Sequence, residues 1–258
     1  MSMKPEHIWM NSQHFDFSKV KRCLFVAPHP DDNEIGAGGF IRYLLDNKRE
    51  VYTLVVTDGR LGGISEKESP EVIVPIRTAE LQAAVAVLGV TGCEQLSLPD
   101  GLPVTDEQLI AAVTEAIRRI KPDLVVTVDP HMRYECHPDH IRVGKAVSTA
   151  VILSGLPYYP EKGGPHECHH CMGIGYYFTD KPTHALDISE YLDIKQKSLE
   201  CYESQLDKKN IDVILAYSEG QAGLPYAETF CLLDTSMLHC LVPRWDSNIA
   251  VLPKRLAE

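Results

Sequence analysis

The sequence lacks any apolar run long enough for a membrane helix. None of its hydrophobic stretches approaches the ~18 residues that a membrane-spanning helix needs. The start, MSMKPEHIWMNSQHFDF, also lacks the short apolar block and the small-residue cleavage site of a secretory signal peptide. We therefore expect a soluble, cytoplasmic protein that has no membrane partner.

Basic residues are scarce relative to acidic ones. The chain has 25 lysines and arginines against 36 aspartates and glutamates, which gives a formal net charge of −11. A chain of this sign repels the phosphate backbone of nucleic acids and anionic lipid surfaces, so we expect neither as a partner. Its 8 cysteines in 258 residues are too sparse for a small disulfide scaffold. Most are expected to be buried thiols in a reducing compartment.

Apolar runs typical of buried strands alternate along the chain with segments of helical period. Strands are expected at 22–27, 50–57, 123–128, 173–180 and 183–188. Helices are expected at 40–48, around 81–88, after a capping box at Thr105 and Gln108, from about 138 and at 189–206. This alternation predicts an α/β fold with a doubly wound, mostly parallel, Rossmann-like sheet that has helices on both faces.

We expect a single domain over residues 1–258, because this length is compatible with one α/β core. Residues 155–172 are rich in Gly, Pro, Tyr and His and are expected to form a loop insertion. The last forty residues carry no pattern that assigns them clearly. Doubly wound sheets place their sites at the carboxyl ends of strands, so the loops after 22–27, 50–57 and 123–128 are the candidates.

The glycine-containing loop after the first strand could serve a phosphate or a metal ion. A phosphate loop has glycines directly after the strand, whereas here PHPDD, residues 28–32, comes first. Its two carboxylates would repel a phosphate. The stretch GAGG also lacks the full dinucleotide spacing, and no Walker lysine follows. These residues favour a metal site over a phosphate site.

Two pairs of potential metal ligands follow two different strands. His29 and Asp32 lie three residues apart after the first strand, and His137 and His140 have the same spacing after the strand at 123–128. The two loops can sit side by side in a doubly wound sheet. Each residue alone could be a helix cap or a surface side chain. Together, imidazole and carboxylate groups from two strand ends predict a metal site.

With these motifs the sequence resembles the PIG-L/LmbE-like family of zinc-dependent N-acetylglucosaminyl deacetylases. The resemblance is carried, in this order, by PHPDDNEIGAGG, VVTDGRLGG, IRTAELQAAVAVLGV, CHPDH and YAETF. The stretches VAPHPDD, VTDG and DPHMRYECHPDH resemble most closely the diacetylchitobiose deacetylase branch. The resemblance implies an LmbE-like fold, a homo-oligomer, and hydrolysis of the N-acetyl group of an N-acetylglucosamine-containing small molecule or oligosaccharide.

The resemblance also implies roles for the residues of the expected site. It implies one Zn²⁺ per chain, bound by His29, Asp32 and His140, with a water molecule at the open fourth position. Asp31 is implied as the general base that takes the proton of this water. A protonated His137 is implied as the group that stabilises the oxyanion of the tetrahedral intermediate.

Further residues have a functional and a structural interpretation. Asp139 is expected to orient the preceding histidine of CHPDH or to cap the helix, and we favour orientation. Arg77 could bind the N-acetylated amino-sugar substrate or pair with Glu80 at helical spacing. Arg60 could reach the substrate or be a solvated loop cation, which we prefer. Asp129 could contact the sugar or cap a turn.

One position departs from the family pattern. The two aspartates are usually followed by glutamate, whereas this chain has Asn33 there and carries its carboxylate at Glu34. The implied ligands and base are untouched. We therefore expect activity to be retained and specificity to differ.

The expected insertion holds a second group of potential ligands. They are His166, Cys168, His169, His170 and Cys171. A single C-x-x-C is weak evidence for a structural zinc site, which needs four ligands. A second metal and a loop pair of thiols stay open as interpretations, and we favour the thiols.

Other functions are compatible with part of the pattern. The enzyme could hydrolyse a different N-acylated substrate. Two histidines and one carboxylate also suit ferrous iron in an oxygenase, although Asp31 has no evident task there. A non-enzymatic sugar- or metal-binding module needs neither a base nor an oxyanion partner, so the presence of Asp31 and His137 argues against it.

Overall fold

The computed structural model describes residues 17–63, 65–101, 103–163, 165–239 and 250–256. Within them the strands are β1 (Arg22–Ala27), β2 (Glu50–Thr57), β3 (Gly92–Leu98), β4 (Leu124–Val128), β5 (Gly173–Tyr177), β6 (His184–Asp187), β7 (Ala227–Asp234) and β8 (Ala250–Val251). The α-helices are α2 (Asp32–Asp46), α3 (Pro70–Leu88), α4 (Asp106–Ile120), α5 (Pro138–Leu153), α6 (Leu192–Leu199) and α7 (Lys208–Tyr217). Short 3₁₀ turns and loops connect these elements.

The described strands form one eight-stranded sheet in the order β3-β2-β1-β4-β5-β7-β6-β8. The five adjacent strands β3, β2, β1, β4 and β5 are parallel to one another, and β6 is parallel to β8. Strand β7 is antiparallel to β5 and to β6. The chain winds outward from β1 through β2 to β3 and then returns to the other side of β1 at β4. The predicted doubly wound, mostly parallel sheet is confirmed, and its switch point lies between β1 and β4.

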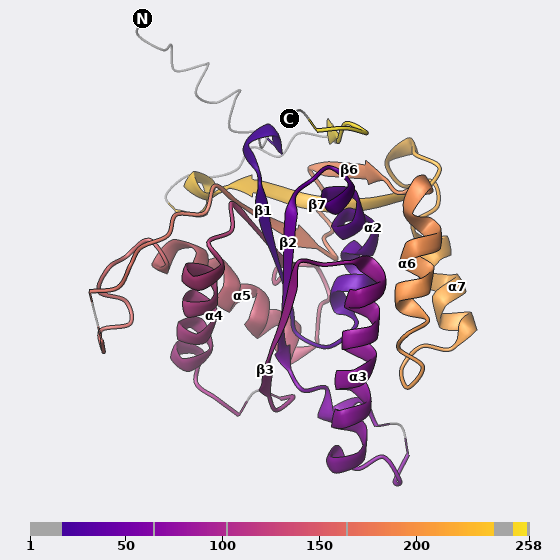
Figure 1. Cartoon of the computed structure of the whole chain (residues 1–258), viewed down its shortest axis with the longest axis horizontal. Helices are drawn as coiled ribbons and strands as arrows, with labels where there is room; N and C mark the ends of the chain where they lie inside the picture. Colours follow the sequence, from indigo (N-terminus) through magenta and orange to yellow (C-terminus); the bar gives the residue numbers. More distant parts are fainter. Residues whose placement is uncertain (1–16, 64, 102, 164, 240–249, 257–258) are drawn as a thin grey trace, which may run out of the picture.

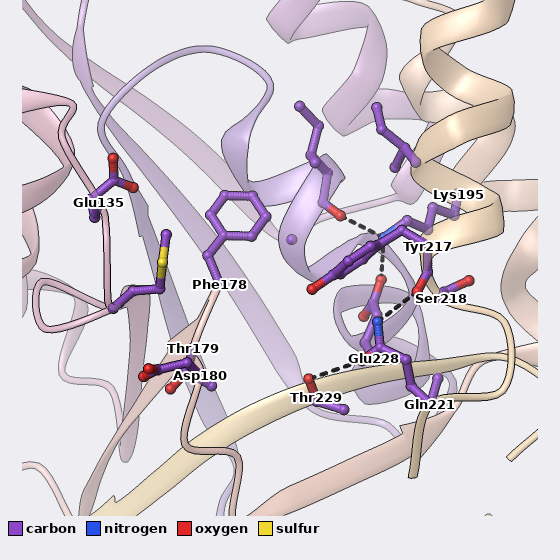
Figure 2. A pocket seen from close by; sticks show the side chains of 15 residues that line it. Glu135, Phe178, Thr179, Asp180, Lys195, Tyr217, Ser218, Gln221, Glu228 and Thr229 are labelled. Atoms are coloured by element: carbon purple, nitrogen blue, oxygen red, sulfur yellow. Dashed lines mark hydrogen bonds and ion pairs between the residues drawn. The ribbon is translucent and has the colours of Figure 1, made fainter. Parts of the chain in front are cut away.

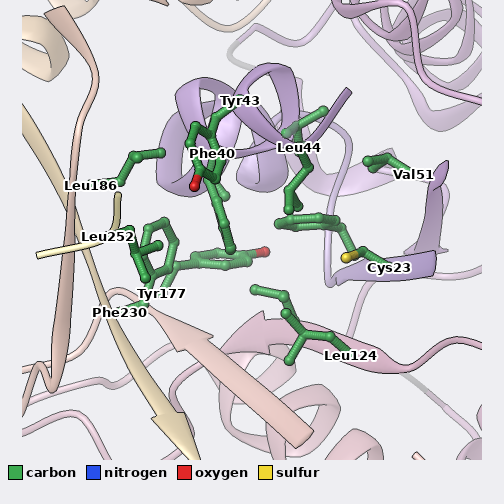
Figure 3. Close-up of a cluster of buried hydrophobic side chains, with 14 of the residues drawn as sticks. Cys23, Phe40, Tyr43, Leu44, Val51, Leu124, Tyr177, Leu186, Phe230 and Leu252 are labelled. Carbon is green, nitrogen blue, oxygen red and sulfur yellow. The ribbon is translucent and has the colours of Figure 1, made fainter. Parts of the chain in front are cut away.

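Helices cover both faces of the sheet, with α4 and α5 on one face and α2, α3, α6 and α7 on the other (Figure 1). Successive side chains of a strand point to opposite faces. Accordingly, Cys23 and Phe25 of β1 pack with Phe40 of α2, whereas Leu24 and Val26 pack with α4 and α5. Figure 3 shows the buried cluster that contains Cys23 and Phe40. The strands nearest the site are therefore buried on both faces and rigidly held.

Helix α2 begins at Asp32, eight residues before the predicted start. The glycines of GAGG, which begins at Gly36, therefore lie inside this helix. The helix is interrupted at Ala37, whose φ is −148°. A Cβ on Gly36 would lie 2.3 Å from Tyr177, and one on Gly39 would lie 2.6 Å from Ile188. The absence of a side chain at these two glycines therefore makes room for side chains of β5 and of the segment after β6.

Of the other elements, some agree with the prediction, some differ from it and some had no prediction. The capping box at Thr105 and Gln108 is present with both hydrogen bonds. The helix predicted at 189–206 is α6 alone, because the chain after it turns and Ser204 binds Glu80 of α3. Strands β3 and β7 and helix α7 had no prediction. Among the described residues of 155–172 there is no helix or strand, and no helix of the described part has the length and apolar character to span a membrane.

Candidate active site

The candidate site lies where β1 and β4 end. Residues 23–26 of β1 are in register with residues 124–127 of β4. The loop after β1 carries His29 and leads into α2, and the loop after β4 carries His137 and leads into α5. Because the order of the sheet reverses here, both loops border the same crevice. Two motifs that are far apart in the sequence therefore meet.

His29, Asp32 and His140 converge so that one donor atom from each lies within 4.8 Å of the others. One carboxylate oxygen of Asp32 lies 3.2 Å from Nδ1 of His29, and the other lies 3.3 Å from Nε2 of His140. His29 and Asp32 are buried. Two imidazoles and a carboxylate are the donor set of many catalytic metal sites. The chain therefore has a His-Asp-His group that could bind a metal ion.

The second nitrogen of each of these imidazoles faces a carboxylate. Nε2 of His29 is hydrogen-bonded to Asp139 at 3.4 Å, whereas Nδ1 of His140 lies 3.2 Å from Glu135 without hydrogen-bond geometry. Metal-binding histidines usually have such a partner on the nitrogen that does not bind the metal. This arrangement shows that the residues fit a metal ion. Glu135 had no role in the sequence prediction, and its position two residues before His137 was the only available signal.

Asp139 supports the site through a different residue from the one expected. Its carboxylate contacts His29 and accepts a hydrogen bond from the backbone N–H of Gly101 at 2.8 Å. The hydrogen bond between Asp139 and His137 instead runs from the backbone N–H of Asp139 to Nδ1 of His137. The carboxylate therefore orients His29, and it neither orients His137 nor caps α5. His29, His137 and Asp139 also form a second group that could hold a metal ion. The first group is the better fit, because Asp139 then serves as the partner of His29.

The charges of the cluster are strongly coupled. Burial opposes ionisation of Asp32, but hydrogen bonds from His140 and His29 hold its pKa well below the usual range. Burial likewise opposes a charge on His29, but Asp139 and Asp32 raise its pKa to about 10. The pKa of His140 is raised by Asp32 against the effect of burial.

Asp31 lies beside the ligand cluster in an unusual backbone conformation. Its φ is 112°, a strained value for a residue other than glycine, and it makes no capping hydrogen bond to α2. Its carboxylate accepts a hydrogen bond from Nη2 of Arg77 at 2.9 Å. Burial and the neighbouring Asp32 raise the pKa of Asp31 to about 8, although Arg77 acts in the opposite direction. A carboxylate with a pKa near neutrality is suited to general base catalysis.

His137 lies at the exposed end of the cluster, where it precedes α5. Its ring centroid is 4.7 Å from that of His29 and 5.0 Å from that of His140. Burial, with the charges of His29 and His140, lowers the pKa of His137. Its Nδ1 accepts the N–H of Asp139 at 3.3 Å, which places the proton of the neutral ring on Nε2. Nε2 of His137 is therefore available as a hydrogen-bond donor, and the protonated form implied by the resemblance stays a prediction.

Arg77 is not paired with Glu80, and a contact with substrate stays a prediction. It is buried, and it donates to Asp31, to the carbonyl of Pro30 at 2.5 Å and to the carbonyl of Gly59 at 3.2 Å. Glu80 instead accepts two hydrogen bonds from the loop after α6. Arg77 therefore fixes the loops after β1 and β2 around Asp31.

The two other residues expected to contact substrate have local partners. Arg60 makes a bidentate ion pair with Asp58, at 2.6 and 2.9 Å, beside the end of β2. Asp129 is buried and accepts the backbone N–H of His131 at 2.8 Å, which is a turn cap. The contact of Asp129 matches its structural interpretation, whereas Arg60 is ion-paired with a buried carboxylate and is not a solvated loop cation. A direct contact of either residue with substrate stays a prediction.

Asn33 and Glu34 point away from the ligand cluster into the core. Asn33 accepts a hydrogen bond from the Tyr177 hydroxyl at 3.2 Å, and Glu34 accepts one from the Tyr202 hydroxyl at 2.9 Å. Burial raises the pKa of Glu34 to about 7. The pair therefore anchors the first turn of α2, which carries Asp32, to β5 and to the segment after α6.

The cysteine and histidine residues of the insertion do not form a group with metal-binding geometry among the described residues. His166 and His169 each bind a backbone carbonyl through Nε2, at 2.9 and 2.7 Å. Cys168 and Cys171 are free thiols, of which Cys171 is buried. Burial raises the pKa of Cys171 to about 12, which keeps it a thiol. These contacts favour the interpretation as loop thiols.

Comparison with known sequences gives the same family as the motifs. A family model described as PIG-L: GlcNAc-PI de-N-acetylase matches residues 24–151. The diacetylchitobiose deacetylase of Thermococcus kodakarensis is 33% identical over 233 residues, which cover 86% of this chain and 87% of that protein. The 1D-myo-inositol 2-acetamido-2-deoxy-alpha-D-glucopyranoside deacetylase of Kineococcus radiotolerans is 31% identical over 165 residues, 52% of this chain and 45% of that protein.

A solved structure agrees with this result. The N,N'-diacetylchitobiose deacetylase of Pyrococcus horikoshii has a TM-score of 0.81 and 28% sequence identity, and the match covers 94% of this chain and 97% of that one. Fold, site and relatives together define an N-deacetylase with a doubly wound α/β domain. The chain belongs to the PIG-L family.

Proposed function

We propose that this chain is a zinc-dependent enzyme that hydrolyses the acetamide of an N-acetylglucosamine-containing small molecule or oligosaccharide. The observation that carries the proposal is the convergence of His29, Asp32 and His140, with Asp31 beside them, at the switch point of the sheet. The relatives from Thermococcus kodakarensis and Kineococcus radiotolerans, which are named as deacetylases of acetylated amino sugars, support the substrate class.

The ligand cluster provides for one metal ion per chain. His29, Asp32 and His140 would hold Zn²⁺ and leave the fourth position of a tetrahedral site open. When bound, Zn²⁺ supplies a Lewis acid and a water molecule whose pKa is lowered to about 7. Asp139 orients His29 through the other nitrogen of the ring, and Glu135 lies 3.2 Å from the other nitrogen of His140.

The remaining residues of the site move protons and stabilise charge. Asp31 takes the proton of the attacking water and can return it to the nitrogen of the leaving amine. Arg77 holds the carboxylate of Asp31 in place during both transfers. His137 donates its Nε2 proton in a hydrogen bond to the oxyanion, an interaction whose removal typically costs a factor of about 10²–10³ in rate.

Rival functions receive less support. An iron oxygenase gives no task to Asp31, and the relatives named above are deacetylases. An N-acyl substrate other than an amino sugar requires no change in the mechanism, so it is tested by the choice of substrates. The homo-oligomer and the cytoplasmic location stay predictions.

Replacement of the base tests the assignment most simply. Asp31→Asn is expected to lower kcat for acetate release by about 10²–10⁴, because the amide cannot accept a proton. Zinc content should stay near one ion per chain, because Asp31 is not a ligand. Asp193→Asn, at an exposed position of α6, is the matched control and should leave kcat unchanged. Full activity of Asp31→Asn would rule out this role.

A further inference from the structure

The carboxylate of Asp100, in the loop after β3, holds the loop after β2 by two hydrogen bonds. Its Oδ1 accepts the backbone N–H of Gly59 at 3.2 Å, and its Oδ2 accepts that of Leu61 at 2.9 Å. These contacts join positions that are 41 and 39 residues apart in the sequence. Asp100 is partly buried, and hydrogen bonds to an ionised carboxylate are stronger than those between neutral groups. The position of the loop after β2 therefore depends on this side chain.

The loop that Asp100 holds packs directly against the guanidinium of Arg77. The carbonyl of Gly59 accepts hydrogen bonds from Nη1 of Arg77 at 3.2 Å and from the N–H of Gly62 at 3.0 Å. The fit is close, because a Cβ on Gly59 would lie 2.8 Å from Cδ of Arg77 and one on Gly62 would lie 2.6 Å from Nη1. A shift of this loop would therefore change both the space around the guanidinium and one of its acceptors.

Arg77 transmits this dependence to the candidate base. Its Nη1 donates to Gly59, and its Nη2 donates to the carboxylate of Asp31 at 2.9 Å. The guanidinium is planar and rigid, so the loss of the acceptor of one nitrogen also affects the position of the other. Three successive contacts therefore lead from Asp100 through Gly59 and Arg77 to Asp31.

The residue next to Asp100 contacts the other half of the site. The backbone N–H of Gly101 donates to Oδ2 of Asp139 at 2.8 Å, and the same oxygen is hydrogen-bonded to Nε2 of His29 at 3.4 Å. The loop after β3 thus reaches the base through a side chain and the ligand His29 through a backbone group. A substitution of Asp100 leaves the N–H of Gly101 in place, so the two effects can be separated.

A cavity of about 370 Å³ borders the ligand cluster at Glu135 and Phe178 (Figure 2). Glu135 lies 3.2 Å from His140, and the ring of Phe178 is at an angle of 5° to that of His140. The described lining of this cavity comes from α2, α6, α7, β7 and the loops after β4 and β5, and no described residue of the loops after β2 and β3 belongs to it. This favours an action of Asp100 through Arg77 over a direct contact with a molecule in the cavity.

We propose that Asp100 is a positioning residue, which acts through the loop after β2 and Arg77 to hold the carboxylate of Asp31 where it takes the proton of the attacking water. The inference rests on the proposed function, in which Asp31 is the base. It assigns to Asp100 no contact with the substrate or with the metal ion. Removal of Asp100 should therefore slow proton transfer and leave the binding of both unchanged.

Substitutions of Asp100 test the proposal in the zinc-loaded full chain with N,N'-diacetylchitobiose. Asp100→Ala is expected to lower kcat about tenfold or more, because a displacement of about 1 Å in a reacting group can cost roughly 10²-fold. Asp100→Asn keeps one acceptor oxygen and should lower kcat less than Asp100→Ala does. KM and the Kd for zinc should stay within about twofold of the wild-type values, because no interaction with substrate or metal is removed.

The same substitution in the Asp31→Asn background separates positioning from a direct effect. If Asp100 acts through the base, Asp100→Ala should lower the residual kcat of Asp31→Asn by less than about twofold, because residues that act as a unit are non-additive. An equal loss of kcat in both backgrounds would overturn the proposal and leave the deacetylase intact. A raised KM with unchanged kcat would overturn it as well, because it would assign Asp100 to substrate binding.

Asp123 provides a matched control at the opposite edge of the sheet, where β4 begins. Its carboxylate also accepts two backbone N–H groups from a distant segment, those of Lys21 and Arg22, at 2.8 and 3.0 Å. Asp123→Ala should therefore lower the unfolding free energy about as much as Asp100→Ala does, and it should leave kcat unchanged. Equal losses of kcat in the two variants would attribute the effect to stability alone and overturn the proposal.

Hydrogen exchange gives a readout that does not depend on activity. The guanidinium protons of Arg77, followed by NMR, should exchange about tenfold faster in Asp100→Ala than in Asp123→Ala, because local opening around Arg77 becomes easier. Equal exchange rates would overturn the proposal whether or not acetate is released. If no N-acetylated sugar releases acetate, the proposed function fails, and with it the role in proton transfer. Faster exchange would then still support the hold of Asp100 on Arg77.

Discussion

Among single residues, Arg77 is the one whose side chain donates a hydrogen bond to the candidate base in the described part of the chain. Its buried guanidinium donates to Asp31 and to two backbone carbonyls. It therefore holds Asp31 in its strained conformation and supplies a positive charge that lowers the pKa of that carboxyl. The planar fork of arginine suits this arrangement, because one side chain reaches several acceptors at once.

Arg77→Met is expected to change both pH dependence and stability. Without the guanidinium, the pKa of Asp31 rises further. The base is then ionised only at higher pH, so the rising limb of the kcat/KM–pH profile moves to higher pH. Loss of one partner of a buried ion pair should also cost about 3–5 kcal/mol of unfolding free energy.

The pH profile and a denaturation curve measure these two effects. Arg119→Met removes an arginine that is 53% exposed and pairs with Glu94, and it should change neither by more than experimental error. A rising limb that stays at the same pH in Arg77→Met would contradict the proposed effect on Asp31.

The sequence could predict the ligand cluster but not all the contacts around it. His29, Asp32 and His140 follow strands whose ends meet in any doubly wound sheet, so spacing and topology suffice. The partners of Arg77 and Glu135 depend on how α3 and the loop after β4 pack, which no local pattern specifies. For this reason Arg77 was assigned to substrate or to Glu80, and Glu135 was missed.

At the level of elements, the interruption of α2 depends on two segments far away in the sequence. Lys195 of α6 donates to the carbonyl of Ile35 before the break, and Glu228 of β7 accepts the N–H groups of Gly39 and Phe40 after it. Lys195 and Glu228 also pair with each other, and both are buried. The pair satisfies backbone groups that the interruption leaves without helical partners.

Glu228→Gln is expected to weaken both the fold and metal binding. It leaves Lys195 as a buried charge with no carboxylate partner, which should cost about 3–5 kcal/mol. Because the break follows the turn that carries Asp32, zinc affinity should fall about tenfold or more. Denaturation and competition with a chelator measure the two quantities. In the control, Glu190→Gln, whose partner Lys254 is 75% exposed, the loss should be below about 1 kcal/mol. Equal losses in both variants would contradict the account.

Two glycines of α2 provide a matched comparison of packing. Gly36→Ala should lower the unfolding free energy by about 1–3 kcal/mol, because its Cβ would overlap the ring of Tyr177 at 2.3 Å. Gly38→Ala meets Lys195 at 3.3 Å, a contact that a small shift relieves, and better helix propensity offsets much of the strain. Thermal unfolding compares the two variants. A Tm for Gly36→Ala equal to that for Gly38→Ala would show that Tyr177 moves aside.

The sequence predicted the elements of the buried half of the sheet better than those of its edges. Strands β1 and β4 are almost wholly buried and appear as short apolar runs. Strand β3 is only partly buried along its length, and α7 buries Ile211 alone. Strand β7 carries Glu228 among its apolar residues because that side chain serves α2. Half-buried and functionally constrained elements lack the periodicity on which prediction depends.

Over the whole molecule, the topology of the sheet positions the candidate site. The switch point between β1 and β4 places the ligand cluster, and residues of α7 and of the antiparallel strand β7 line the cavity beside it.

The most direct test of the central claim is metal-dependent acetate release. Purified protein is assayed with N,N'-diacetylchitobiose before metal removal, after treatment with a chelator, and after return of Zn²⁺. The account predicts equal amounts of acetate and free amine, loss of activity on metal removal, and recovery at about one zinc ion per chain. Full activity of the metal-free protein, or no acetate from any N-acetylglucosamine-containing sugar, would contradict it.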